Sequence, residues 1–309
     1  MTLFAAALLG AATGCTSTPA LPPKAAELNA LGVEALEKGD LETADARFAL
    51  ALEYSPRFVE ALTNRGLLEL QRGNFTKARQ LLARARRINP DIAQPHHGLG
   101  VLAERERRPD EASEYYREAL RVDPGFAPAR ANLARLLFDA GLLEHAREEW
   151  KKLVEVDLDH PDGCAGLAET LIRLERVGEA DAAVAQGLLR FPSQPQLSIL
   201  KARLRLRHGE YDTAVRLLEP LAGANDDVAA AALGWIATAE LARGRPRHAV
   251  GAAERAVQMA PGDPVATYAL AMALAELEDP GARAWIERAL VIAPGDAALE
   301  RARVRITGR

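Results

Sequence analysis

Apolar and small residues recur along this chain with a period of 34 residues. In the first period Leu28, Leu31, Ala44, Phe48 and Ala51 alternate with polar positions at the spacing of amphipathic helices. Three sets of residues keep the 34-residue spacing: Pro56, Pro90 and Pro124; Gly32, Gly66 and Gly100; and Ala44, Ala78 and Ala112. A repeat of this length predicts a helical hairpin that stacks on its neighbours.

The positions of glycine and proline within each period indicate two helices joined by a turn. Glycines at Gly39, Gly73, Gly141 and Gly209 fall where the first helix should stop. The proline ends the second helix, because the residue before a proline disfavours helical geometry. Small residues at the eighth and twentieth positions of the period allow the two helices to cross closely.

This arrangement resembles the tetratricopeptide repeat family. The resemblance implies an all-α, right-handed solenoid of about eight helix-turn-helix repeats, closed by a polar capping helix that Asp296 opens. We expect the fourth repeat to lack its proline, the sixth to degenerate around 220–227, and the eighth to be short by a residue or two between its helices. The expected repeats are 25–58, 59–92, 93–126, 127–160, 161–194, one from 195, one around 230–263, and one from about 264 to 295.

Composition narrows the function classes. The chain has 309 residues, 27% of them charged, with a net charge of −4, so nucleic acid is not expected as a partner. Aromatic residues make up only 5%, which favours helices. Cys15 and Cys164 are the only cysteines, so no disulfide framework is expected.

The N-terminal segment carries a different signal. Residues 1–14 are uncharged and mostly apolar or small, but too few to span a bilayer. They end in Ala12-Thr13-Gly14-Cys15, which resembles the bacterial lipoprotein signal. The resemblance implies a signal peptide at 1–14, a lipidated Cys15 that opens a proline-rich tether at 15–24, and a solenoid at 25–309. Because no aspartate follows Cys15 directly, it also implies the periplasmic face of the outer membrane, with the lipid as the only membrane contact.

In the resembled family the concave surface is lined by the first helix of each repeat. Asn64 and Asn132 stand where an amide can bond a bound peptide backbone in both directions. Such a surface suits an extended segment or a helix of a protein partner. The partner-binding residues expected on it are Asn64, Leu67, His97, Arg105, Asn132, Arg135, Phe138, Arg203, Arg207 and Tyr268.

Other candidate sites carry less. His96 and His97 are adjacent on a helix and point about 100° apart, so they do not form a metal site, and we expect one packed and one exposed ring. Cys164 is expected to be a small packing residue. No catalytic or phosphate-binding motif is present, so neither an enzyme nor a cofactor is expected.

These features predict a non-catalytic scaffold that assembles an envelope complex. Lipoproteins of this build resemble the pilotins of type IV pilus secretins and the assembly lipoproteins of tight-adherence pili. Two alternatives stay open: a soluble intracellular interaction module whose residues 1–14 are a misread leader, and an adaptor subunit of a cytochrome-maturation or polysaccharide-export complex.

Overall fold

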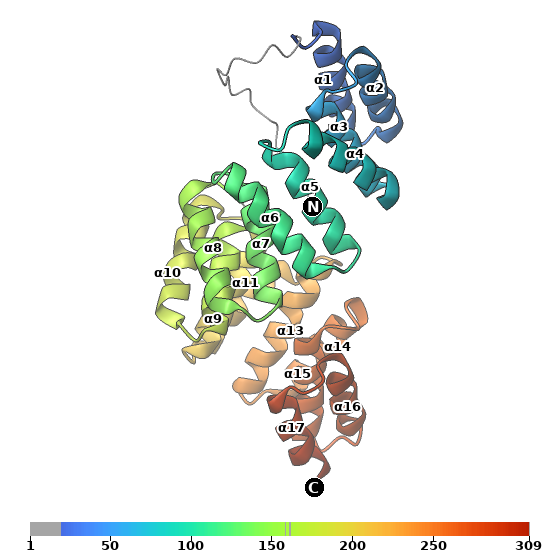
Figure 1. Ribbon diagram of the computed structural model, residues 1–309. Helices are drawn as coiled ribbons and strands as arrows, with labels where there is room; N and C mark the ends of the chain where they lie inside the picture. The colour runs from blue at the N-terminus through green and yellow to red at the C-terminus, as the bar shows by residue number, and fades with distance from the viewer. Residues whose placement is uncertain (1–19, 158, 161, 309) are drawn as a thin grey trace. The chain divides into compact units, whose positions relative to one another are not determined.

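The computed structural model of the protein describes residues 20–157, 159–160 and 162–308. The signal segment and Cys15 lie outside the described residues. All regular elements within these ranges are helices, so the predicted all-α fold is confirmed (Figure 1). The chain divides into two compact units, unit 1 at Met1–Gly141 and unit 2 at Leu142–Arg309.

Unit 1 contains seven helices within its described part. Consecutive helices form hairpins, and we call the first helix of each hairpin helix A and the second helix B. The helices are α1 (Pro23–Glu37), α2 (Leu41–Tyr54), α3 (Val59–Gln71), α4 (Phe75–Ile88), α5 (Ala93–Arg105), α6 (Pro109–Val122) and α7 (Ala127–Asp139).

Unit 2 continues the same order of A and B helices. Its first helix, α8, is a helix B by its place in the repeat, and its last, α17, has no helix B after it in the described chain. The helices are α8 (Leu143–Val156), α9 (Gly163–Arg173), α10 (Val177–Arg190), α11 (Pro195–Arg207), α12 (Tyr211–Leu218), the 3₁₀ turn η1 (Glu219–Leu221), α13 (Asp227–Ala242), α14 (Pro246–Met259), α15 (Pro264–Glu276), α16 (Ala282–Ile292) and α17 (Ala297–Thr307).

The glycine of the eighth repeat position is required by close packing inside a hairpin. A Cβ placed on Gly100 would lie 2.5 Å from Cε1 of Tyr116, and one placed on Gly32 would lie 2.5 Å from Cε1 of Phe48. Both rings are completely buried. The aromatic side chain of helix B therefore occupies the space that the missing Cβ leaves on helix A.

The turn between helices A and B has one backbone conformation in all eight repeats. Position 15 has a positive φ, supplied by glycine in five repeats and by Arg107, Glu175 and Glu278 in the other three (φ 60°, 59° and 58°). The glycines are Gly39, Gly73, Gly141, Gly209 and Gly244. The four predicted glycine turns are thus confirmed.

Successive hairpins are joined by arginines that reach back along the chain. Nη2 of Arg84 donates to the Pro56 carbonyl at 2.7 Å, and Nη2 of Arg255 donates to the Ala222 carbonyl at 3.2 Å. Arg288 does the same to Pro261 at 3.3 Å. Each of these guanidinium groups satisfies a carbonyl in the loop just before its own repeat, so the loop geometry depends on the next hairpin.

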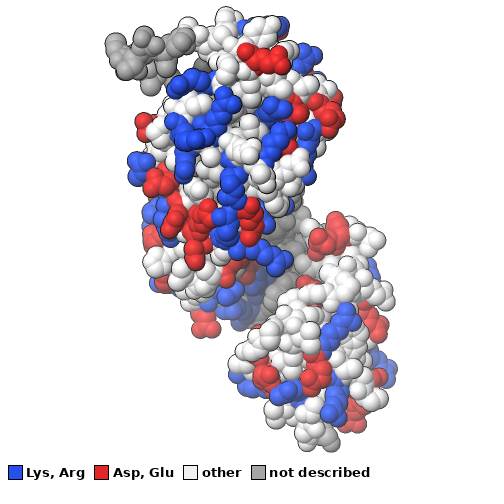
Figure 2. Space-filling view, turned by 45° about the vertical axis from the view of Figure 1, so that its right-hand side comes forward, with Lys and Arg blue, Asp and Glu red and all other residues white. Residues whose placement is uncertain are grey.

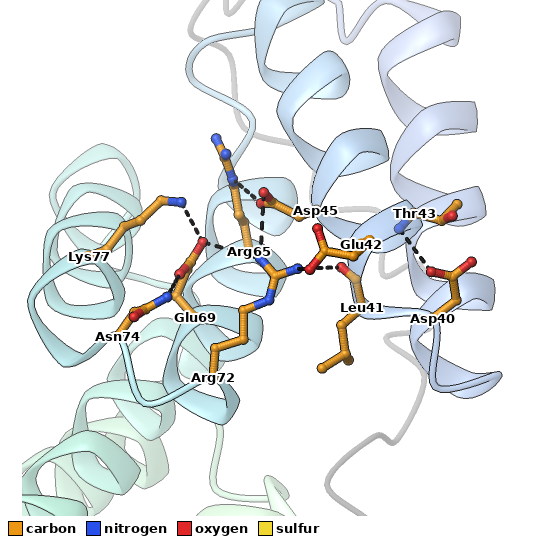
Figure 3. A network of polar contacts seen from close by, with 10 residues as sticks. All are labelled: Asp40, Leu41, Glu42, Thr43, Asp45, Arg65, Glu69, Arg72, Asn74 and Lys77. Atoms are coloured by element: carbon orange, nitrogen blue, oxygen red, sulfur yellow. Dashed lines mark hydrogen bonds and ion pairs between the residues drawn. The ribbon is translucent and has the colours of Figure 1, made fainter.

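A polar clasp joins the first two hairpins of unit 1 (Figure 3). Glu69 on α3 is fully buried, and its carboxylate accepts from Asn74 Nδ2 at 2.7 Å and Lys77 Nζ at 2.5 Å. Arg72, one turn after Glu69, crosses to α2, where it donates to Glu42 at 2.6 Å and to the Leu41 carbonyl at 3.1 Å. This clasp pairs a buried charge, which would otherwise destabilise the fold.

The structure differs from the expectations in two places, at the end of the tether and in the turn of the eighth repeat, which was expected to be short between its helices. Helix α1 begins at Pro23, so the last two residues of the predicted 15–24 tether are helical, because proline suits the first helical position. In the eighth repeat, helix α16 begins only at Ala282, so the turn between α15 and α16 is longer than the corresponding turns of the other repeats. The irregular sixth repeat is confirmed by the short α12 and the turn η1. The capping helix is also confirmed, since Asp296 accepts from the backbone N–H groups of Ala298 and Leu299.

Candidate protein-binding face

The A helices of each unit lie beside one another, and side chains link them directly. In unit 1 these are α1, α3, α5 and α7, and in unit 2 they are α9, α11, α13 and α15. We call the surface that their outward residues form the helix-A face of each unit. The ten predicted partner-binding residues all lie on A helices, seven on α3, α5 and α7 of unit 1 and three on α11 and α15 of unit 2.

The two predicted amides of unit 1 are already engaged with the preceding helix A. Nδ2 of Asn64 donates to Oδ1 of Asn29 at 3.0 Å, which joins α3 to α1. Nδ2 of Asn132 lies 3.0 Å from Nε2 of His97, which joins α7 to α5. Both asparagines are half-buried, so each keeps its other amide atom for further contacts.

His97 supports the face from below and does not line it. It is only 6% exposed, and its ring centroid lies 5.7 Å from that of Tyr116 and 5.5 Å from that of Phe126. Burial lowers the pKa of His97 to about 4, so the ring is neutral at pH 7 and its Nε2 can accept from Asn132.

The expectation of one packed and one exposed histidine is wrong, because His96 is also buried. Its Nε2 lies 2.9 Å from the Pro90 carbonyl, and the side chain is 5% exposed. Helix α5 packs against α3, α4 and α6 and is bonded by side chains of α7, and this leaves little of its circumference to solvent.

Charged residues lie near the C-terminal ends of the A helices of unit 1. Arg135 on α7 donates to Glu104 on α5 at 2.7 Å and lies 3.7 Å from Asp139. Arg105 is exposed and has no ion pair among the described residues. Leu67 and Phe138 are partly buried, and Leu67 packs over Gly98 on the next helix A.

A chain of contacts also crosses the A helices of unit 2. Arg203 on α11 forms an ion pair with Glu169 on α9, and its guanidinium lies over the ring of Trp235 on α13, 4.9 Å from the centroid. Arg207 is exposed without an ion pair among the described residues, and Tyr268 is partly buried on α15. The structure therefore brings Arg203 and Trp235 together, although the sequence analysis had not selected Trp235.

The position of Trp235 within its repeat indicates that it belongs to this face. It stands at position 6 of its repeat, the same position as Asn64 and Asn132. Glu169 stands at position 9, as Arg135 and Arg203 do. Aligning all the repeats on these positions would have selected both residues.

Other candidate groups form no site within the described part of the chain. Cys164 is 3% exposed, and burial raises the pKa of its thiol, as expected of a packing residue. No group of three His, Cys, Asp or Glu side chains in residues 20–157, 159–160 and 162–308 could hold a metal ion. Across the same residues, none of the helices has both the length and the apolar character needed to cross a membrane.

All the family models that match the sequence describe the same kind of repeat. Profiles of the tetratricopeptide repeat match residues 58–125, 103–163, 199–264 and 236–297, together about two thirds of the chain. The chain belongs to the tetratricopeptide repeat family. No curated protein sequence matches it significantly.

Solved tetratricopeptide repeat structures share the fold at low sequence identity. A chain of the APC/C hetero-tetramer Cut9–Hcn1 has a TM-score of 0.67 and 16% identity over 88% of this chain, which spans only 55% of that one. PilF of Pseudomonas aeruginosa has a TM-score of 0.55 and 22% identity, covering 67% of this chain and 94% of its own. PilW, a type IV pilus biogenesis factor, has a TM-score of 0.57 and 22% identity, covering 65% and 93%.

The tetratricopeptide repeat fold indicates a scaffold for protein interaction, and its members are generally not catalytic. The charge of this member fits that class. In the view of Figure 2, Lys and Arg side chains are interspersed with Asp and Glu, and neither sign covers the visible surface alone.

Proposed function

We propose that this protein is a non-catalytic scaffold, anchored through Cys15 to the periplasmic face of the outer membrane, that binds a protein partner on its helix-A faces. Its task would be the assembly of an envelope complex such as a pilus or a secretin system. The observation that carries the binding role is the pair of exposed arginines without an ion pair among the described residues, Arg105 and Arg207. Each lies on linked A helices that also carry partly buried apolar side chains.

Two further points support the choice of system. PilW, which has the same fold, acts in type IV pilus biogenesis. The sequence before Cys15 resembles a lipoprotein signal, and a polar, proline-containing segment separates Cys15 from α1. An extended segment advances by about 3.1 Å per residue, so a tether between Cys15 and α1 would hold the folded repeats clear of a membrane surface.

Replacement of the cysteine tests the anchor. The Cys15→Ser chain, expressed in a Gram-negative bacterium, should lose incorporation of radiolabelled fatty acid and leave the membrane fraction, whereas Cys164→Ser should keep both. Continued membrane association of Cys15→Ser would contradict anchoring through Cys15. An unprocessed cytosolic wild-type chain would instead support the soluble intracellular module.

Site-specific crosslinking tests the binding face. A photoreactive amino acid at Arg105 or Arg207 should crosslink a partner in cells, while the same group at the exposed Gln80 or Gln186 of helices B should not. Recovery of a secretin or pilus subunit supports the proposal. Recovery of a haem-lyase or polysaccharide synthase would replace it by the adaptor alternative, and equal crosslinking from all four positions would contradict binding on the helix-A faces.

A further inference from the structure

We infer that the helix-A face of unit 2 binds an amphipathic helix whose acidic residues meet the end of α11 and whose apolar face covers α13 and α15. The inference rests on the proposed function and specifies the partner of one of its two faces. It follows from three observations: the apolar surface of this face, its lack of the position-6 amides found in unit 1, and the position of its positive charge.

The outward residues of this face are mostly apolar and only partly buried. On α11 these are Ile199 and Leu206, and on α13 they are Trp235 and Leu241. Tyr268 on α15 packs against the same cluster as Leu241. Partly exposed aromatic and aliphatic side chains in neighbouring rows form a broad apolar surface, which an amphipathic helix covers with residues spaced three and four apart.

This face lacks the amides that, on the unit 1 face, could pair with an extended backbone in both directions. Position 6 holds Leu200, Trp235 and Ala269 on α11, α13 and α15, in place of the asparagines of unit 1. The hydroxyl of Thr238 donates to the Gly234 carbonyl at 3.0 Å, within its own helix. An extended segment would leave more of its backbone groups without partners here than on the unit 1 face, whereas a helix satisfies its own backbone.

Positive charge gathers on α11. This helix carries Lys201, Arg203, Arg205 and Arg207 and no acidic residue. Glu169 pairs with Arg203, and Asp181 and Glu210 pair with Arg205, whereas Arg207 is exposed and forms no ion pair among the described residues. A carboxylate of the partner would pair with the exposed guanidinium of Arg207.

The spacing of the A helices sets the pattern of the partner. Neighbouring packed helices are about 8–10 Å apart, and a helix rises about 1.5 Å per residue. A partner helix that crosses α11, α13 and α15 therefore meets Arg207 with its acidic residue and covers Trp235 with apolar residues at least about five residues later. It reaches Tyr268 after at least about five residues more.

A peptide-display selection tests the inference on the full Cys15→Ser chain, with random 20-residue peptides as the probe. We expect enriched peptides to carry Asp or Glu near one end and apolar residues at helical spacing, and to gain helical circular dichroism on binding. Trp235→Ala and Arg207→Glu should each weaken their binding at least tenfold. Arg247→Glu, the same charge change at an exposed position of helix B α14 outside this face, is the matched control and should leave it unchanged.

A charge exchange sharpens the test. Peptides in which Lys replaces the acidic residues should bind Arg207→Glu better than the parent chain. Enriched peptides with alternating apolar residues, a central proline without loss of binding, or no dependence on Trp235 would overturn the inference, as would a failure to enrich any peptide. The proposed scaffold role would survive each of these results if the crosslinks at Arg105 and the anchoring through Cys15 hold.

Discussion

The helix-A faces of the two units are built on the same hairpin and differ in chemistry. In unit 1, side chains on neighbouring A helices hydrogen-bond to one another, as in Asn64 with Asn29 and Arg135 with Glu104. In unit 2, the corresponding positions hold Trp235, Tyr268 and aliphatic side chains, with Arg203 as the link. The comparison teaches that the repeat sets where these positions lie, while a few outward residues decide what each face can bind.

The interior of the two units differs less, because in each a large ring of a helix B fills the space that a glycine leaves on a helix A. Trp150 in unit 2 is 6% exposed, and a Cβ on Gly166 already meets its ring at 2.5 Å. Trp150→Ala should lower the free energy of unfolding by about 3–5 kcal/mol. The loss should stay local, since repeats contact mainly their neighbours.

Hydrogen exchange followed by mass spectrometry measures this effect. Protection should fall in α8–α10 and persist in α1–α4, and Tyr116→Ala should reverse the pattern by opening α5 and α6. Trp150→Phe serves as the milder control. An equal loss of protection in both units would show that they unfold together, contrary to the prediction.

The next largest difference between the two units should be in how far acid destabilises them. His97 in unit 1 is neutral when folded, with a pKa of about 4 against an ordinary 6.5. The unfolded chain binds a proton here as the pH falls below about 6.5, and the folded chain does so only near 4, so stability decreases across this interval. The difference corresponds to about 3 kcal/mol.

Carboxylates of unit 1 extend the effect to lower pH. Burial alone would raise the pKa of Glu69 and of Asp45, but the hydrogen bonds from Lys77 and Asn74 to Glu69, and from Arg65 to Asp45, outweigh it, so both pKa values are lowered. Their stabilisation is present above the unfolded pKa and is lost as pH falls through the folded value.

Hydrogen exchange measured at pH 7 and pH 5 tests whether His97 causes this loss of stability. Helices α5 and α7 should lose protection at pH 5, after correction for the intrinsic rate, and His97→Gln should remove most of that change. A pH response that is unaltered in His97→Gln would assign the acid sensitivity to other groups.

The buried glutamates at position 11 offer a closer comparison of the two units. Glu69 uses both carboxylate oxygens, whereas Glu240 in unit 2 accepts from Arg243 at 2.5 Å and its other oxygen has only Arg245, 3.9 Å away. In both clasps the arginine at position 14 pairs with helix B of the preceding hairpin, Arg72 with Glu42 and Arg243 with Asp212.

Glu69→Gln should therefore cost about 1.5–3 kcal/mol, because an amide N–H₂ would face Lys77 or Asn74. Glu240→Gln should cost less. Urea unfolding of each variant beside the parent chain gives both values, and a larger loss for Glu240→Gln would reverse our ranking of the two clasps.

The smallest expected effect concerns the turns. Arg107 in unit 1 and Glu175 in unit 2 occupy a left-handed conformation that glycine adopts without steric cost. Arg107→Gly and Glu175→Gly should each stabilise the chain by up to about 1 kcal/mol, while Gly73→Ala should destabilise it by about as much. Thermal unfolding detects these shifts, and a lower Tm in both glycine variants would show that their side chains make compensating contacts.

The hairpins, the four glycine turns and the Asp296 cap could be predicted from the sequence, because each depends on local residues at a fixed period. The burial of both His96 and His97 could not, since it depends on how many helices surround α5. The bonds that use Asn64 and Asn132 join residues 35 positions apart, and only the placement of adjacent A helices reveals them. Trp235 was missed because position 6 had been considered only where it held an amide.

The arginines that reach back to the preceding loop carry a consequence for biogenesis. Arg84, Arg255 and Arg288 each bond a carbonyl 27 to 33 residues earlier, a segment that has already emerged when the arginine appears. A chain delivered from its N-terminus onward, by a ribosome or through a translocation pore, can therefore complete one hairpin at a time. Such short-range closure favours rapid folding and leaves little unpaired surface waiting for distant segments to arrive.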